Sequence, residues 1–128
     1  MLKIFTDSEA TNELTTDEVR DAVPAGETMI AERQLFLKSD STDKTYENVS
    51  INALNDVDNP SDSGEISYRY AADDGNGSPE EYVNLLEFDS GDFDSAVPFW
   101  RKAIAPNVQN AFKNTEIEHN LQFDEYIK

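Results

Sequence analysis

The chain contains a single histidine, His119, and an imidazole is the side chain best suited to acid–base catalysis near neutral pH. Catalysis would also need a nucleophile within hydrogen-bonding reach and a third group to orient the ring. The sequence has no cysteine and no G-x-S-x-G motif around a serine. His119 lies in the apolar phase of an alternating run, between Ile117 and Leu121. These features favour a satisfied or half-buried strand histidine, and we predict no catalytic residue.

Two acidic loops carry oxygen donors of the kind that bind Ca²⁺ or Mg²⁺. The first, Asp56–Ser61, begins like an EF-hand loop, but Pro60 stands where a ligand belongs and Ser61 where glycine is needed. The second, Asp73–Asn76, places two aspartates beside a glycine and an asparagine in an expected turn. Acidic loops of this kind are commonly plain solvated turns. We therefore predict no metal or cofactor site, and keep a Ca²⁺ or Mg²⁺ ion at these acidic loops as the weaker alternative.

Neighbouring carboxylates, the groups that glycosidases use in pairs, occur at several places. They include Glu80 with Glu81, Asp92 with Asp94, and Glu116 with Glu118. In a chain so rich in acids a pair of carboxylates carries little information, and these pairs fall in expected turns or exposed strand positions. The sequence also lacks a glycine-rich phosphate loop. We do not expect an enzyme.

Phe99 and Trp100 are adjacent aromatic residues in an expected strand, so their side chains should point to opposite faces. A sandwich core needs large inner residues, and one of the two is expected to fill it. The other, with Tyr68 or Tyr70, would form an outer aromatic patch for a partner. Core packing is the favoured role for these rings.

Charge is the most extreme property of the chain, which has 27 acidic and 10 basic residues and a formal net charge of −17. Three interpretations compete: a folded protein adapted to high salt, a partly disordered acidic chain, and an acidic surface for a basic partner. The acids are dispersed through apolar alternation rather than gathered in long blocks, which argues against disorder. We favour adaptation to high salt. Nucleic acid is not an expected partner, because phosphate binding needs clustered lysine and arginine.

The length of 128 residues corresponds to one ordinary domain, here residues 1–128. The N-terminal residues lack the apolar segment of a signal peptide, and no apolar run approaches the roughly 18 residues of a membrane helix. We expect a soluble chain that is not exported by a signal of its own and that has no membrane partner. Residues 6–17 are polar and are interpreted as a loop or as an arm that faces a partner.

Two segments with period-two alternation, Glu32–Lys38 and Tyr46–Ala53, indicate half-buried strands. Their apolar faces are formed by Leu35 and Leu37 in the first, and by Val49, Ile51 and Ala53 in the second. The polar link Ser39–Thr45 joins them. We predict that the two strands pair as the central hairpin of the fold.

Further strands are expected along the chain, separated by loops rich in Asp, Asn, Gly, Ser and Pro. They are Met1–Phe5, Ile66–Ala72, Tyr82–Phe88, Val97–Ile104 and Thr115–Tyr126, with Thr15–Val23 as a weaker extended segment. The predicted turns and loops are Pro24–Glu27, Asn55–Glu65, Asp73–Pro79 and Asp89–Ser95, and Ala105–Asn114 is a connection or a single helical turn. Pro98 must lie at a strand start, an edge or a bulge. About seven strands without an amphipathic helix predict a single-domain, all-β, antiparallel β-sandwich.

The segment Glu32–Leu54 and the strand around Trp100 resemble small immunoglobulin-like proteins of tailed viruses. In that family a strand ending in L-K-N/S precedes a polar turn and a strand with Y-x-N/D-V/I, as in Leu37–Ser39 and Tyr46–Val49. A glycine-bearing turn, an F-W-x-R/K strand and a proline-containing connection follow. Here these are Ser90–Asp92, Pro98–Lys102 and Ala105–Pro106. The resemblance spans about Pro24 to Phe123, and the abundance of Asp and Glu is its main departure, which suggests a haloarchaeal host.

The resemblance implies a single immunoglobulin-like β-sandwich without a catalytic site. Such proteins lie on tails, baseplates or capsid surfaces, and they assemble symmetrically around an axis through their edges and loops. The implied partners are other virion structural proteins and copies of the same chain in a symmetric homo-oligomer.

We therefore expect a non-enzymatic structural protein of a haloarchaeal tailed virus, placed in the tail, baseplate or neck. It would be assembled in the host cytoplasm at high salt and located in the virion. One alternative is a capsid decoration or turret protein on the exterior of the head. Another is a cellular, secreted-surface or adhesive module of a halophile that binds protein or carbohydrate through Tyr and Trp.

Overall fold

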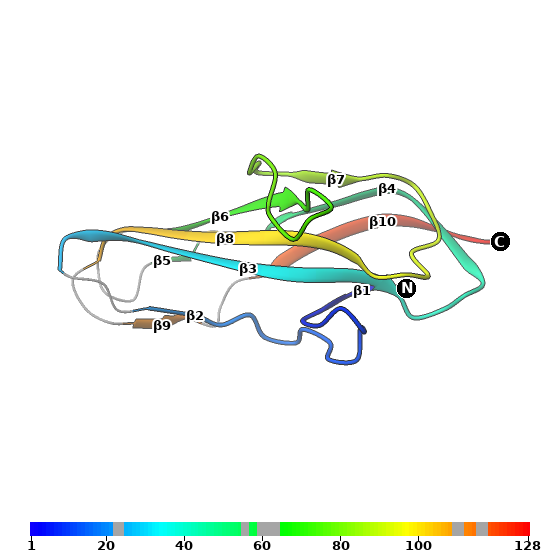
Figure 1. Ribbon diagram of the computed structural model, residues 1–128, viewed down its shortest axis with the longest axis horizontal. Coiled ribbons are helices and arrows are strands. Elements are labelled where there is room, and N and C mark those ends of the chain that lie inside the picture. Colours follow the sequence, from blue (N-terminus) through cyan, green and yellow to red (C-terminus); the bar gives the residue numbers. More distant parts are fainter. Residues whose placement is uncertain (22–24, 55–56, 59–64, 109–111, 115–117) are drawn as a thin grey trace.

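The computed structural model describes residues 1–21, 25–54, 57–58, 65–108, 112–114 and 118–128 (Figure 1). Within these ranges the chain forms β-strands and no helix. The strands are β1 Leu2–Phe5, β2 Val19–Asp21, β3 Glu27–Ser39, β4 Lys44–Ala53, β5 Val57–Asp58, β6 Glu65–Ala72, β7 Leu86–Phe88, β8 Val97–Val108, β9 Phe112–Asn114 and β10 His119–Ile127. The pairings between them are antiparallel. The predicted all-β antiparallel sandwich is confirmed.

Two main sheets form the sandwich. The larger has the strand order β1-β3-β8-β6-β5, and the smaller has the order β10-β4-β7. β2 and β9 form a separate two-stranded ribbon. Figure 1 shows β3 and β8 running side by side along the length of the molecule, with the smaller sheet toward the end that carries the C-terminus.

The apolar faces of the two sheets meet in the main core. Leu35 and Leu37 of β3 are fully buried, as are Val49 and Ile51 of β4, and these four side chains belong to one cluster. Ala53, at the end of the same face of β4, is half-buried. Full burial of a side chain of this size contributes roughly 1.5–3 kcal/mol. The predicted inward faces of both strands are confirmed.

A second apolar cluster lies where β2 packs on the larger sheet. Its buried members are Val19, Met29, Ile66, Tyr68, Ala103 and Ala105. Val19 is only 1% exposed, so the chain is anchored immediately after the polar segment 6–17. That segment is held by its own contacts: Asp7 accepts hydrogen bonds from the backbone of Thr11 and Asn12, and the Leu14 amide donates to the carbonyl of Ile4. These contacts fit the loop interpretation.

The two segments predicted to pair as a hairpin lie in different sheets, so that prediction is wrong. β3 pairs with β1 and β8, whereas β4 pairs with β10 and β7. The link between Ser39 and Lys44 crosses from one sheet to the other. Period-two alternation arises because each strand turns one face to the same core. It therefore cannot distinguish strands that pair within a sheet from strands that face each other across the core.

Several segments differ from the predicted elements. Ala105–Asn114, predicted as a connection or helical turn, instead contains the end of β8 and, after the undescribed residues 109–111, β9. The predicted strand Tyr82–Phe88 is reduced to β7, preceded by an isolated bridge between Val83 and Tyr70. The predicted loop Asn55–Glu65 contains β5 and the first residue of β6, and its other residues lie outside the described chain. The partner strands, which local sequence does not reveal, decide these lengths.

β4 contains a bulge that interrupts its alternation. Tyr46 and Val49 both point into the core although three positions separate them. The register against β10 shifts between Gln122 and Asp124, and Asn48 has φ of 53°. Asparagine tolerates this left-handed conformation better than most residues, so it absorbs the extra residue of the bulge.

Pro98 lies at the start of a strand, as predicted. It is the second residue of β8, where it stands opposite Phe36 of β3. The pairing of β8 with β6 begins one residue later, at Phe99 opposite Ala72. Pro98, which has no N–H group, therefore fits at a position that is paired with only one neighbouring strand, β3.

Candidate functional site

His119, the first residue of β10, is held between two polar side chains. Its Nε2 atom lies 2.7 Å from Oδ2 of Asp17, and its Nδ1 atom forms a short hydrogen bond with the hydroxyl of Tyr70. A neutral ring with its proton on Nε2 satisfies both contacts, because it donates to the carboxylate and accepts from the hydroxyl. The side chain is 6% exposed. These contacts agree with the predicted satisfied strand histidine.

Asp17 is the centre of a buried polar group that we call the Asp17 cluster. Its members are Asp17, Arg33, Tyr70, Arg101 and His119. Arg101 donates two hydrogen bonds to the carboxylate, from Nε at 3.0 Å and from Nη2 at 2.9 Å. Arg33 donates a third from Nη1 at 3.0 Å. Such a bidentate guanidinium–carboxylate pair is among the strongest hydrogen-bonded contacts in proteins.

Electrostatics in the Asp17 cluster favour the charged carboxylate. Burial alone would raise the pKa of Asp17, because desolvation disfavours the anion. The hydrogen bond from His119 and the positive charge of Arg101 outweigh that effect and lower the pKa of Asp17 to about 2. The Asp17 side chain is 1% exposed, so its charge is compensated by these partners rather than by water.

An aspartate, a histidine and a tyrosine in one hydrogen-bonded chain could in principle relay a proton. In the Asp17 cluster, however, two guanidinium groups share the carboxylate, and the side chains of Asp17 and Arg101 are 1% and 3% exposed. The cluster connects the segment before β2 to β3 and β8 of the larger sheet and to β10 of the smaller sheet. The hydrogen bonds and ion pairs of the Asp17 cluster therefore hold the two sheets together.

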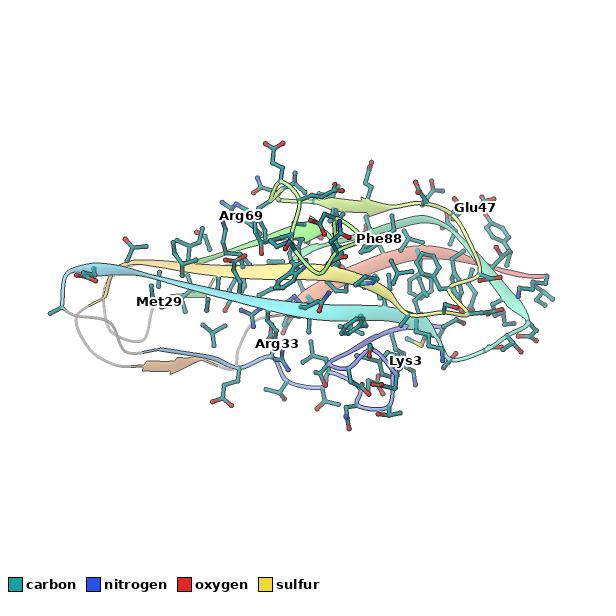
Figure 2. All side chains as sticks on the ribbon, viewed as in Figure 1. Lys3, Met29, Arg33, Glu47, Arg69 and Phe88 are labelled. Carbon is teal, nitrogen blue, oxygen red and sulfur yellow. The ribbon has the colours of Figure 1, made fainter. Side chains whose placement is uncertain are left out.

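The sequence interpretation missed Asp17, Arg33 and Arg101. Two signals were available, because Arg33 lies between Ala31 and Leu35 in the inward phase of β3, and Arg101 occupies the inward phase of β8. A guanidinium on an apolar strand face needs a carboxylate partner. Which of the many acids supplies it is decided only by the path of the chain. Arg33 is labelled beside β3 in Figure 2.

A second candidate is a surface hollow of about 620 Å³ between the end of β7 and the start of β8, which we call the acidic groove. Its apolar lining is formed by Ala72, Phe88, Phe93, Val97 and Pro98. Its acidic lining is formed by Asp73, Glu87, Asp89 and Asp92. Figure 2 labels Phe88, whose ring makes edge contacts with Phe93 and Phe99 at centroid distances of 6.5 Å and 5.6 Å.

Phe93 has an unusual backbone at this groove. Its φ is 53°, in the left-handed region that bulky residues rarely adopt, and its side chain is held against the rings of Tyr46 and Phe88. The Phe93 carbonyl accepts a hydrogen bond from the backbone amide of Ser39. Packing and this hydrogen bond keep the strained residue in place.

The loop after β6 uses its acidic oxygens for contacts within the protein. Asp73 accepts hydrogen bonds from Trp100 Nε1 at 3.0 Å and from the Gly75 amide at 2.9 Å, and Asp74 accepts from the amides of Asn76 and Ser78. The hydrogen bond from Trp100, which outweighs desolvation, lowers the pKa of Asp73. No group of three metal-ligating side chains occurs in the part of the chain that the structure describes. The first acidic loop, Asp56–Ser61, lies almost wholly outside that part.

The aromatic side chains are distributed between the core and the surface differently from the prediction. Phe99 fills the core, as expected for one of the pair, and Trp100 points to the other face, where Asp73 holds its indole. Tyr68 and Tyr70 are 1% and 0% exposed, so the predicted outer patch that combines one of them with Trp100 is wrong. Both tyrosines share the inward phase of β6 with Ile66, which is why they are buried.

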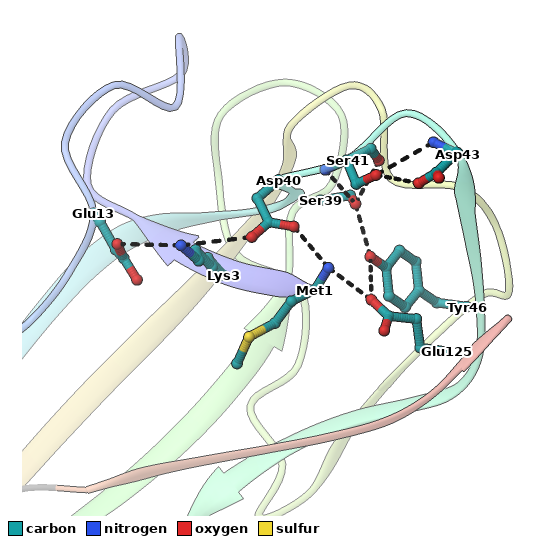
Figure 3. Close-up of polar contacts among 9 residues, drawn as sticks. All are labelled: Met1, Lys3, Glu13, Ser39, Asp40, Ser41, Asp43, Tyr46 and Glu125. Carbon is teal, nitrogen blue, oxygen red and sulfur yellow. Dashed lines mark hydrogen bonds and ion pairs between the residues drawn. The ribbon is translucent and has the colours of Figure 1, made fainter. Parts of the chain in front are cut away.

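The link after β3 is fastened to the protein itself (Figure 3). Ser39 Oγ lies 2.7 Å from the buried hydroxyl of Tyr46, which also donates to Glu125 of β10 at 3.0 Å. Lys3 pairs with Asp40 at 3.6 Å, and the Asp40 amide donates to the carbonyl of Met1. These contacts tie the crossing between the sheets to both of them.

Comparison with known proteins gives no family for the chain: no family model matches it, and no curated protein matches it either. In the described ranges there is no helix of the length and apolar character needed to cross a membrane. A function for the chain must therefore be inferred from the geometry of the Asp17 cluster and of the acidic groove.

Proposed function

We propose that this chain is a non-enzymatic structural protein of a virion, a tail, baseplate or neck component of a tailed virus that infects a halophilic archaeon. In this role it acts by occupying a position in an assembly, in contact with other virion proteins and with symmetry-related copies of itself. The high-salt host accounts for its acidic surface.

One observation carries the non-enzymatic part of the proposal. The only histidine of the chain is used inside the Asp17 cluster, where its two ring nitrogens are engaged by Asp17 and Tyr70. The residues best suited to acid–base chemistry thus serve to join the sheets. A rigid sandwich with exposed edges and loops is well suited to placement in a larger assembly.

Mass spectrometry of purified particles tests the proposal. The chain should be found in gradient-purified virions at a constant ratio to the major capsid protein. Its absence from such particles would reject the proposal. A three-fold or five-fold arrangement on a map of the head would move the protein to the capsid exterior, as a decoration or turret subunit.

The acidic groove favours a second candidate, a cellular binding module of a halophile that contacts protein or carbohydrate. A gene neighbourhood without virion genes, together with absence of the chain from particles, would select this function. An enzymatic role is tested by His119→Gln, assayed at a temperature at which circular dichroism shows the variant to be folded; any activity that copurifies with the chain should then be unchanged.

A further inference from the structure

We propose that the acidic groove binds a short segment of a partner protein in which lysine or arginine alternates with apolar residues. This partner chemistry deepens the proposed assembly role and rests on that role. It is supported by the shape of the groove, by the charges around it and by two of its carboxylates, which form no ion pair within the described chain.

The size and lining of the groove fit a few side chains of a peptide. A volume of about 620 Å³ lies within the range of sites that bind small ligands. Phe88, Val97 and Pro98 are half-buried and leave apolar surface in the groove. A second hollow of about 360 Å³ shares Glu87, Phe88 and Ser90 with the first and extends the depression onto β4. An extended segment can therefore lie along both hollows.

The charges of the groove select a basic occupant. Four carboxylates line it, from Asp73, Glu87, Asp89 and Asp92, and no lysine or arginine is among its described lining residues. Asp73 is already engaged by Trp100, and Asp92 lies 3.5 Å from Nζ of Lys128. Glu87 and Asp89 are exposed, and neither takes part in the ion pairs of the described chain. These two carboxylates are free to receive a cation.

Lysine and arginine match this combination better than any other side chain. Their aliphatic stems cover apolar surface while their charged ends reach nearby carboxylates. A second copy of this chain is a poor occupant of this groove, because a chain with 27 acidic and 10 basic residues offers few cations to the four groove carboxylates. The matching partner carries a basic segment with apolar neighbours.

Fluorescence anisotropy tests the inference with a labelled heptapeptide of sequence GLKVRLG, titrated with the protein. A peptide of sequence GLEVELG is the charge-reversed control. The salt is the lowest at which thermal melting shows a folded protein, because the Debye length is only about 3 Å at 1 M. We expect saturable binding of the basic peptide, no binding of the acidic one, and weaker binding when the titration is repeated at 1 M salt.

A pair of double variants locates the binding. Glu87→Gln with Asp89→Asn should weaken binding of the basic peptide roughly three- to tenfold, as expected for the loss of two exposed charge contacts. Glu80→Gln with Glu81→Gln changes the net charge equally but lies outside the groove, and should change binding less than twofold. Equal effects of the two double variants, equal binding of both peptides, or no saturable binding would each overturn the inference.

Chemical shift mapping keeps the test independent of how the variants fold. On addition of the basic peptide to the wild-type protein, the amide signals of Ser90 and Gly91, which line the groove, should move. The signal of Gly26, which precedes β3 and does not line the groove, should stay in place. The outcome is separable from the virion proposal. A chain present in particles that does not bind the peptide refutes the groove inference alone, and a chain that binds the peptide but is absent from particles refutes the virion role.

Discussion

At the scale of single residues, the carboxylate of Asp17 is a buried charge that is compensated by hydrogen-bonded partners rather than by water. It accepts hydrogen bonds from Arg33, Arg101 and His119, which come from three different strands. A buried ion group of this kind adds little compared with an apolar core of the same volume, but removing one member leaves the others uncompensated. Asp17 should therefore be far more sensitive to substitution than any exposed acid of the chain.

We predict that Asp17→Asn lowers the free energy of unfolding by about 3–5 kcal/mol, because the buried guanidinium of Arg101 and the partly exposed one of Arg33 lose their counter-ion. Urea denaturation followed by circular dichroism measures the change. Asp89→Asn is the matched control, since Asp89 is exposed and should cost less than about 0.5 kcal/mol. Equal losses for the two variants would contradict the fastening role of the Asp17 cluster.

The same carboxylate predicts a dependence of stability on pH. Its pKa in the folded protein is about 2, below the ordinary value of 3.8, so folding favours the charged form. The stabilisation is complete above pH 4 and is lost as the pH falls through 2, and it amounts to about 2 kcal/mol. The difference in unfolding free energy between wild type and Asp17→Asn should shrink over this interval. A difference that stays constant from pH 6 to pH 2 would be inconsistent with a depressed pKa.

At the scale of elements, the bulge in β4 lets two large residues of one strand reach the same core. Asn48, with φ of 53°, is the extra residue of the bulge, and its side chain donates a hydrogen bond to Asp124 at 2.8 Å. The bulge lies between Tyr46, which holds the crossing after β3, and Val49 of the main core. The backbone conformation of Asn48 thus sets how Tyr46, at the crossing, and Val49, in the core, are placed relative to each other.

We predict that Asn48→Val lowers the free energy of unfolding by about 1–3 kcal/mol, because a β-branched residue is strained at positive φ. Asn48→Gly should be nearly neutral, since glycine adopts this backbone freely and only an exposed hydrogen bond is lost. Ser50→Val introduces the same side chain at a position without positive φ and is the control. Thermal melts of the three variants measure the effect, and equal losses for Asn48→Val and Ser50→Val would argue against strain as its cause.

At the scale of the whole molecule, charge repulsion competes with the two apolar clusters. The described ion pairs include the Asp17 cluster and the surface pairs of Lys3 and Lys128. Exposed pairs contribute little, typically below about 1 kcal/mol. Against a net charge of −17 they cannot offset the mutual repulsion of the acids, so screening by salt should matter for stability.

We predict that the melting temperature falls when salt is diluted below roughly 0.2 M, because the Debye length grows and the acids repel one another more strongly. Differential scanning calorimetry across a NaCl series measures the change. Glycerol at matched osmolality is the control for osmotic effects. It should not restore the melting temperature at low salt, because it does not screen charge. A melting temperature that does not change over the series would reject the high-salt interpretation of the acidic surface.

Local sequence determined the strands with strong alternation. Leu35 and Leu37 face the core, as their spacing indicates, and so do Val49 and Ile51, because a strand with one wet face must alternate. The inward position of His119 was predictable from the same phase. Neither the partner of each strand nor the extension of β8 to Val108 could be predicted, because pairing depends on residues that are distant in the chain.

Tertiary structure alone decided where the polar groups meet. The sequence presents Asp17 as one of 27 acids, and only the fold brings it within hydrogen-bonding distance of Arg101, which is 84 positions away. The same is true of the acidic groove, whose residues come from the ends of β6, β7 and β8. Alternation is a local consequence of strand geometry, whereas the choice among equivalent acids depends on the path of the whole chain. For that reason the sequence by itself determined a sandwich, and only its tertiary structure decided which acids fasten the sheets and which remain free to bind.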